Sequence, residues 1–384
     1  MDLTAALARA RSPQPPGPDT PAGPAVRTWP GPARRIPRAD PGALDLDALL
    51  RLSLAAADGT GRLRPASSAG ALHPVDTELV VGAGCSLPPG RYGYDPLRHR
   101  VHPLGAPPPG TPPGVRAELT VSARRTASHY GHRAWPLLLL DTGHAAAALL
   151  LAARALGVGP ARPEADGRTA TPLAAVHVPQ PGPFPGTAGP TPDRTPSTYA
   201  PKPADAPTRA DAPTPAELLA RRSAPPPLHG TPTPEALRDV LRTAERAGGG
   251  VLRWCAAVGP PRPGLVALAP DGTTLRRLAA GEARPTLAVW AAGQAWLAQA
   301  GAVVLGRGCP DDADAPHIRR AHLRAGLAVH LAHHTAHRHG LAARPVGSWQ
   351  RADLGAALGG PPGRDWIVHG LALGTHHADE ENTT

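Results

Sequence analysis

The stretch of this chain best suited to chemistry is a short loop of small and hydroxyl residues, Ser67-Ser68-Ala69-Gly70. It lies between Arg64 and Pro74 and leads into an apolar segment, Thr77-Glu78-Leu79-Val80-Val81, that is typical of a strand. Glycine and alanine let a backbone approach a flat ligand closely, while serine hydroxyls and backbone N–H groups can bind its polar edge. The loop therefore indicates a ligand site, although an ordinary turn before a strand has the same composition.

A second group of chemically capable residues is a set of histidines spaced along one helix face. They are His330, His333, His334 and His337, at positions i, i+3, i+4 and i+7. Imidazoles at this spacing can bind a metal ion. No acidic residue or cysteine accompanies them nearby in the sequence. We therefore predict interface packing or pH-sensitive contacts for this face, and no metal site.

Three further segments follow the Ser67 loop in a fixed order. They are Pro88-Pro89-Gly90-Arg91-Tyr92-Gly93-Tyr94-Asp95-Pro96, then His129-Tyr130-Gly131-His132-Arg133, and then an apolar run that ends in Asp141-Thr142-Gly143-His144. This order resembles the nitroreductase superfamily, and within it the SagB-type FMN-dependent dehydrogenases, which oxidise thiazolines and oxazolines in ribosomal peptides to thiazoles and oxazoles. The resemblance implies an α+β fold, FMN as cofactor, a ribosomal peptide as substrate, and a cyclodehydratase or other peptide-modifying enzymes as partners.

The chain also repeats one pattern along its length. Leucine follows glycine after 14 positions both from Gly90 and from Gly264, and the helical segment from Gly143 to Gly157 recurs as 326–340. Two features in the same order, displaced by about 175 to 185 residues, indicate a duplication. We therefore predict a loosely ordered segment (1–40), a first nitroreductase-like half (41–178), a Pro-rich linker (179–213) and a second half (214–384). The two halves would form an intrachain pseudo-dimer, with further association into a homo-oligomer left open.

Proteins of the nitroreductase superfamily are usually homodimers that bind FMN at the subunit interface with residues of both subunits. Here only the first half has the Ser67–Gly70 loop, with Arg64 before it. Only the second half has Arg221-Arg222-Ser223, like the family's phosphate-binding Arg-Arg-Ser, and Pro345-Val346-Gly347, like its flavin-edge loop. The resemblance implies one FMN across the interface, its phosphate on the arginine pair and Ser223 and its ring between the two loops. The arginine pair has a second interpretation as a solvated helix end.

The resemblance also implies catalytic residues. The peptide dehydrogenases have a Lys-Tyr pair just before a Gly-Glu-Arg-Gly-Tyr-Arg motif, and the corresponding positions here are His129 and Tyr130. Because histidine titrates near neutrality, His129 can replace the lysine as the base that removes a proton from the azoline ring. Tyr130 has a second interpretation as a buried ring whose hydroxyl binds a backbone carbonyl. Many family members also have basic residues near the C-terminus, and this chain ends without them.

Composition limits the classes of partner. The chain has 384 residues, 52 of them Pro, and a formal net charge of +10 that comes almost wholly from arginine. No cluster of basic residues with interleaved aromatics occurs, so we expect no nucleic-acid partner. Three cysteines without metal-ligand spacing, and no apparent secretion signal, indicate a reducing, cytoplasmic location. The apolar run 136–158 contains Asp141, His144 and Arg154, which predicts a buried helix after a short strand and no membrane span.

The sequence leaves three functions open. The first is an FMN-dependent azoline dehydrogenase acting on a ribosomal peptide. The second is a flavoenzyme of the same fold that uses NAD(P)H to reduce small electron-poor molecules. The third is a scaffold without catalytic activity in a peptide-modifying complex, which the absence of the family's lysine favours.

Overall fold

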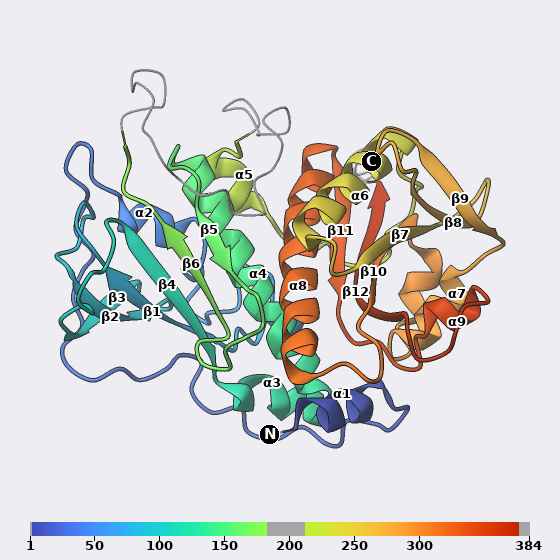
Figure 1. Ribbon diagram of the computed structural model, residues 1–384, viewed down its shortest axis with the longest axis horizontal. Helices are drawn as coiled ribbons and strands as arrows, with labels where there is room; N and C mark the ends of the chain where they lie inside the picture. Colours follow the sequence, from blue (N-terminus) through green and yellow to red (C-terminus); the bar gives the residue numbers. More distant parts are fainter. Residues whose placement is uncertain (1, 183–211, 376–384) are drawn as a thin grey trace, which may run out of the picture.

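A computed structural model describes residues 2–182 and 212–375. Most of the predicted linker, residues 183–211, lies outside the described residues. Within the described ranges the strands form two six-stranded antiparallel sheets. Figure 1 shows one sheet on each side of the molecule, with two long helices between them.

The first sheet has the strand order β3-β2-β1-β4-β6-β5. Its strands are β1 (Val75–Val81), β2 (Gly90–Asp95), β3 (Arg100–Gly105), β4 (Val115–Val121), β5 (Arg162–Glu164) and β6 (Ala174–Val178). The second sheet has the order β9-β8-β7-β10-β12-β11 when it is listed in the same direction. Its strands are β7 (Arg253–Val258), β8 (Gly264–Leu268), β9 (Leu275–Ala280), β10 (Ala302–Gly308), β11 (Leu341–Val346) and β12 (Trp366–Thr375).

The two sheets correspond strand for strand, because β1 pairs with β2 and β4 as β7 pairs with β8 and β10. Each half also has one long helix, α4 (Ala134–Ala155) or α8 (Ala315–Arg338), before its last two strands. The shorter helices are α1 (Leu3–Arg11), α2 (Leu46–Arg51), α3 (Ala123–Tyr130), α5 (Pro215–Ala220), α6 (Pro234–Gly248), α7 (Arg284–Trp290) and α9 (Leu354–Ala357). The predicted duplication of one α+β unit is confirmed.

The two long helices cross at a pair of glycines. A Cβ atom on Gly143 of α4 would lie 2.2 Å from the carbonyl oxygen of Leu323, and one on Gly326 of α8 would lie 2.1 Å from that of Leu140. Only glycine allows backbones to approach this closely. Figure 1 shows α4 and α8 side by side along the axis that relates the halves. Both helices are buried along most of their length, so the hydrophobic cores of the two halves meet there.

Local sequence signals account for several of the shorter helices. Helix α2 begins after Asp45, whose carboxylate accepts from the N–H of Ala48. Helix α6 has Thr233 as its N-cap and Pro234 as its first residue, as the Pro-at-N1 preference predicts. Its buried face includes Leu237, Val240 and Leu241, which share one side at helical spacing.

The short strand expected before α4 is wrong, because the chain is helical from Ala134 onward. Four consecutive leucines have no periodicity that separates a strand from a buried helix. Pro136 is compatible with the helix, since it lies in the first turn, where backbone N–H groups have no partner within the helix. The stretch Ala123–Ala155 is long and apolar enough to cross a membrane, but 89% of its most apolar window is buried inside this fold.

The N-terminal segment contacts both halves of the fold. Helix α1 lies against the second half, where Arg11 donates to the carbonyl of Cys309 at 2.7 Å. Farther along, the N–H of Thr20 donates to the carbonyl of Ser128 in the first half at 2.8 Å. Proline carbonyls of the segment also accept hydrogen bonds from arginines of α3. The described residues of this segment therefore connect the two halves, and loose order over 1–40 stays a prediction.

The glycine crossing gives a test of the fold. We expect Gly143→Ala to lower the free energy of unfolding by about 1–3 kcal/mol, because the new methyl group meets the backbone of α8. Helix propensity alone would favour alanine by about 1 kcal/mol, so the sign of the effect identifies the contact. Gly159→Ala is the control, since a Cβ there has no neighbour within 4 Å. Urea unfolding of the three proteins checks this, and a Gly143 variant as stable as the parent would contradict it.

Candidate functional site

A cavity of about 640 Å³ lies between the two halves. The first half contributes the Ser67–Ala71 loop, the end of α3 and one face of α4, and the second half contributes residues 344–348. Its lining residues are Pro16, Gly17, Asp19, Arg62, Ser67, Ser68, Ala69, Gly70, Ala71, His129, Tyr130, Arg133, Leu137, Leu140, Asp141, His144, Ser223, Ala292, Gln294, Arg344, Pro345, Val346, Gly347, Ser348 and His369. The volume lies within the range of about 300–1,000 Å³ that is usual for ligand pockets.

The Ser67–Ala71 loop has a strained backbone. Gly70 has a φ of 60°, and the non-glycine residues Ala71 and His73 also lie in the left-handed region, at 53° and 43°. Left-handed backbone at ordinary residues costs free energy and is found mostly at functional sites. The hydroxyl of Ser67 is buried and has no hydrogen-bond partner in the described structure. A strained loop with an unpaired buried hydroxyl fits a wall that completes its hydrogen bonds with a ligand.

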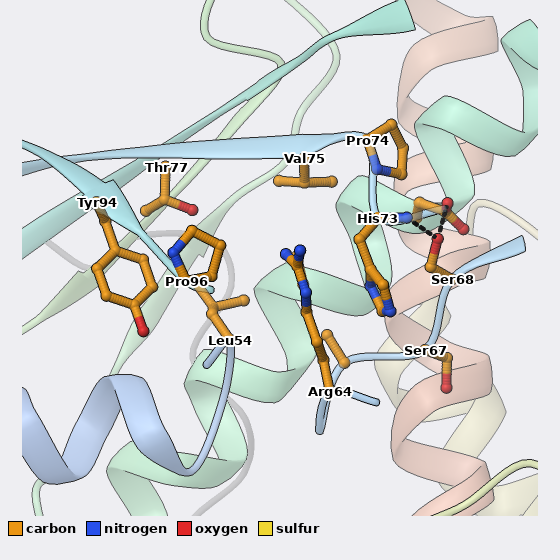
Figure 2. Close-up of a pocket in the computed structure, with 13 residues that line it drawn as sticks. Leu54, Arg64, Ser67, Ser68, His73, Pro74, Val75, Thr77, Tyr94 and Pro96 are labelled. Carbon is orange, nitrogen blue, oxygen red and sulfur yellow. Dashed lines mark hydrogen bonds between the residues drawn. The ribbon is translucent and has the colours of Figure 1, made fainter. Parts of the chain in front are cut away.

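Asp141 of α4 holds this loop in place. Its carboxylate accepts from the hydroxyl of Ser68 at 2.7 Å and from the N–H of Ala69 at 3.0 Å. The Ser68 oxygen in turn accepts from the N–H of His73 at 2.9 Å, and Figure 2 shows the bonds of Ser68 as dashed lines. Burial in an apolar helix face raises the pKa of Asp141 to about 7, and the bond from Ser68 offsets part of that rise. The sequence motifs gave Asp141 no role at this site.

The opposite wall is the predicted flavin-edge loop Pro345-Val346-Gly347, at the end of β11. The carbonyl of Val346 accepts from the indole N–H of Trp349 at 2.9 Å. Gly347 packs on α4, where a Cβ atom on it would lie 2.8 Å from Leu137. The Pro345–Gly347 loop therefore packs on α4, the same helix whose Asp141 binds the Ser67–Ala71 loop.

His129 and Tyr130 lie at the C-terminal end of α3 and both line the cavity. Tyr130 is partly buried, its hydroxyl would be 3.2 Å from a Cβ on Gly70, and burial raises its pKa, with a further rise from Asp141. His129 is exposed, with Nδ1 3.0 Å from a carboxylate oxygen of Asp19 in the N-terminal segment. Their roles as catalytic residues stay predictions.

Of the three predicted phosphate-binding residues, one lines the cavity and two do not. Ser223 lines the cavity, whereas the guanidinium of Arg221 is buried and donates to the carbonyls of Pro65 at 2.6 Å and Arg64 at 3.1 Å. Arg222 is exposed and donates to carbonyls of its own segment. The arginine pair therefore does not line the cavity, because Arg221 ends α5 and turns toward the first half.

Arg64 also lies outside the large cavity. It enters a separate space of about 20 Å³, which shares Ser67, Ser68 and Asp141 with the large cavity and has room for about one water molecule. Figure 2 shows its side chain rising between His73 on one side and Pro96 on the other. Burial lowers the pKa of Arg64 to about 10. Its Nε donates to the carbonyl of Gly61 at 3.0 Å, and its side chain does not line the large cavity.

The histidines of α8 face the interface between the halves. His330 and His333 are 2% exposed and His334 is 6% exposed, and burial lowers the pKa of all three. His333 donates to the carbonyl of Arg222 at 3.2 Å. Within residues 2–182 and 212–375, no three histidine, cysteine or acidic side chains are placed to share a metal ion.

Sequence reasoning missed four residues that line the cavity, Asp141, His144, Arg344 and His369, as functional candidates. For Asp141 a signal existed, because a carboxylate within an apolar helical run needs a buried partner. No local pattern marks His369, which lies in an apolar strand far from the other site residues in sequence. Only the fold brings it to α4.

Comparison with solved structures identifies the architecture. The structure of a proposed nitroreductase from Anabaena variabilis matches 98% of this chain and 100% of its own, with 16% identity and a TM-score of 0.74. The chain has a nitroreductase-like fold. No protein-family model and no curated protein sequence matches it. At this level of identity the likeness establishes the fold and leaves the reaction to be argued from the site.

Two partial matches have TM-scores of 0.31, too low to support an argument. One is a chain of the E. coli microcin synthetase McbBCD complex with truncated pro-MccB17 bound, at 19% identity over 40% of this chain and 68% of that one. The other is a proposed nitroreductase in complex with FMN from Desulfovibrio desulfuricans, at 21% identity over 44% of this chain and 88% of that one.

The raised pKa of Asp141 gives a test by pH. Because the folded-state pKa of about 7 exceeds the unfolded value of about 4, this carboxyl lowers stability as the pH rises between those values, by up to about 4 kcal/mol. Asp141→Asn cannot ionise. We expect the unfolding free energy of the parent, relative to that variant, to fall between pH 5 and pH 8. A difference independent of pH would contradict the assignment of a buried, perturbed carboxyl.

Proposed function

We propose that this protein is an FMN-dependent oxidoreductase with one flavin site, made jointly by its two halves. The observation that supports this most is the cavity of about 640 Å³ that has the Ser67–Gly70 loop on one wall and Pro345–Gly347 on the other. The residues present suit a flavin. The unpaired hydroxyl of Ser67 offers a hydrogen bond. Gly70 and Gly347 pack closely against Tyr130 and Leu137 and have no side chain to keep a flat ring away from their backbone.

The phosphate of FMN would lie near Ser223 and Arg344. Both residues line the cavity, and Arg344 donates to the carbonyl of Ala224, next to Ser223, at 3.1 Å. A guanidinium can offer two parallel donors to phosphate oxygens, and Ser223 adds a hydroxyl. Arg221 would act indirectly, since its bonds to Pro65 and Arg64 join the segment before Ser223 to the base of the Ser67 loop.

The chemistry divides between the cofactor and two side chains. When bound, FMN supplies an acceptor for the hydride that leaves the substrate. His129 is oriented by Asp19: a carboxylate can only accept, so Nδ1 of the neutral ring has the proton and Nε2 has a free lone pair. That lone pair is the proposed proton acceptor, and the hydroxyl of Tyr130, beside Gly70, orients the substrate.

The substrate we propose is a thiazoline or oxazoline ring in a ribosomal peptide, which follows ring formation by a cyclodehydratase. The support is the motif order of the first half together with the position of Tyr130 on the cavity wall. Arg62, Arg133 and Arg344, which all line the cavity, would favour an acidic segment of the peptide or of a partner enzyme.

One observation favours the reduction of small molecules with NAD(P)H as a second candidate. Pro16, Gly17 and Asp19 of the N-terminal segment form part of the cavity wall, and Arg133 fixes the segment by a bond to the carbonyl of Gln14 at 2.6 Å. A wall at this position narrows the space that a long peptide substrate would need.

The reaction can be tested with an FMN-loaded preparation and a synthetic peptide that contains an azoline ring. We expect each ring to lose two hydrogen atoms, detected by mass spectrometry, while the flavin absorption bleaches under anaerobic conditions. Oxidation of NAD(P)H with a nitroaromatic compound, and an unchanged peptide, would support the second candidate instead. A chain that takes up no FMN would support a scaffold.

Tyr130→Phe is expected to lower turnover by about 10² while leaving the flavin content unchanged, because the ring remains and only the hydroxyl is lost. Tyr92→Phe is the matched control, since Tyr92 is a tyrosine outside the cavity whose hydroxyl donates to the carbonyl of Pro88 at 2.9 Å. Steady-state kinetics and flavin absorption together check the prediction. Full activity of the Tyr130 variant would remove this residue from the catalytic assignment.

A further inference from the structure

Two buried histidines connect the central helix of the first half to the flavin-edge loop of the second. Nδ1 of His369, on β12, lies 3.0 Å from the carbonyl oxygen of Val346. Nε2 of the same ring lies 3.0 Å from Nε2 of His144, on α4. Both side chains are 2% exposed and both line the cavity. The contact thus crosses the interface between the halves at the base of the proposed flavin site.

The hydrogen-bond partners determine the tautomer of each ring. A carbonyl oxygen only accepts, so Nδ1 of His369 has the proton and, in the neutral ring, Nε2 has the lone pair. Nε2 of His144 must then donate, which leaves the lone pair of His144 on Nδ1. That Nδ1 is buried and has no partner in the described structure. The two hydrogen bonds therefore run in one direction: His144 donates to His369, and His369 donates to the carbonyl of Val346.

The surroundings keep both rings neutral. Burial lowers the pKa of His144 far below its usual range, and it lowers that of His369 to about 4. The groups that face His144 from neighbouring elements are His330, with its ring centroid 5.5 Å away, and the more distant Arg221 and His333. Each of them opposes a positive charge on His144. Neutral rings are the condition for the donor and acceptor order described above.

The duplication provides an internal comparison. Gly143 of α4 corresponds to Gly326 of α8, so Leu327 occupies the position of His144. In the first sheet Ala174 pairs with Leu119 as His369 pairs with Gly306 in the second, so Ala174 corresponds to His369.

Val346 itself corresponds to Glu164, from the pairing of β5 with β6 and of β11 with β12. The pseudo-symmetric position therefore has Leu327, Ala174 and Glu164 where this site has His144, His369 and Val346. The same fold forms at the pseudo-symmetric position without the imidazoles, so the pair is not required by the architecture. The histidine pair is present at the position that has the large cavity.

We propose that His144 and His369 are a positioning pair for the flavin-edge loop, and that they fix the direction of the Val346–Gly347 peptide. A trans peptide unit is planar, so its C=O and N–H point in opposite directions. Because His369 and Trp349 both donate to the carbonyl of Val346, that carbonyl points toward them and the N–H of Gly347 points away from them. That N–H is then set in one orientation before any ligand binds. The role toward FMN rests on the function proposed above.

The tautomers can be tested without flavin. Nitrogen-15 NMR of the histidine-labelled full chain distinguishes a protonated ring nitrogen from one with a lone pair. At pH 7 we expect His369 to be protonated on Nδ1 alone and His144 on Nε2 alone. The opposite tautomer at either ring, or an imidazolium at pH 7, would overturn the proposal.

The positioning role is tested by replacing each histidine with its counterpart from the other half. We expect His144→Leu and His369→Ala to weaken FMN binding at least tenfold and to shift the flavin absorption bands, since the Val346–Gly347 peptide is no longer fixed. His369→Asn keeps a donor near the position of Nδ1, and we expect it to restore most of the affinity. His334→Leu is the control, because His334 is a buried histidine of the same interface that does not line the cavity.

The outcomes separate the two proposals. Near-parent affinity and spectrum in both His144→Leu and His369→Ala would overturn the positioning role, as would an equal loss in the His334 control. Failure of His369→Asn to recover any affinity would also contradict it, since that variant retains the donor. If the parent protein takes up no FMN, the proposed function fails. The tautomers measured by NMR then decide on their own whether hydrogen bonds run from His144 through His369 to Val346.

Discussion

The close contact between α4 and α8 is the constraint on which the site depends. Gly143 and Gly326 allow the two helices to meet backbone to backbone, and this contact sets how the halves face each other. Leu137, Leu140, Asp141 and His144 then lie on the cavity side of α4. The helix thus supports the loop of the first half through Asp141 and the loop of the second through Gly347. A larger residue at the crossing would move both walls together.

The duplication explains why one site is built from unlike halves. In a symmetric dimer each subunit must have every element of the site, whereas a fused pair needs each element only once. Here the strained Ser67–Gly70 loop lies in the first half, and Ser223, Arg344 and the His369 chain lie in the second. At the equivalent of His369 the first half has Ala174, and at that of His144 the second has Leu327. The two halves have kept one fold and diverged in side chains.

Sequence reasoning could predict the elements whose signals are local. The two sheets, the α6 cap at Thr233 and the glycine spacing of the long helices all follow from turn, capping and repeat patterns. The start of α4 was missed because a run of leucines has no period. The contacts of the N-terminal segment with α3 and with Cys309 were missed because they join residues far apart in the sequence. The arginine pair at 221 showed the limit of motif reasoning, since spacing does not determine which way a guanidinium turns. His369 has no local signal at all.

The central claim is that two unlike halves form one flavin site, and the flavin-to-chain ratio tests it most directly. The purified chain would be stripped of bound cofactor and titrated with FMN, with flavin absorption and fluorescence quenching followed to saturation. We predict saturation at one FMN per chain. Saturation at two would contradict the division of the site between the halves, and failure to bind FMN would contradict the flavin assignment itself.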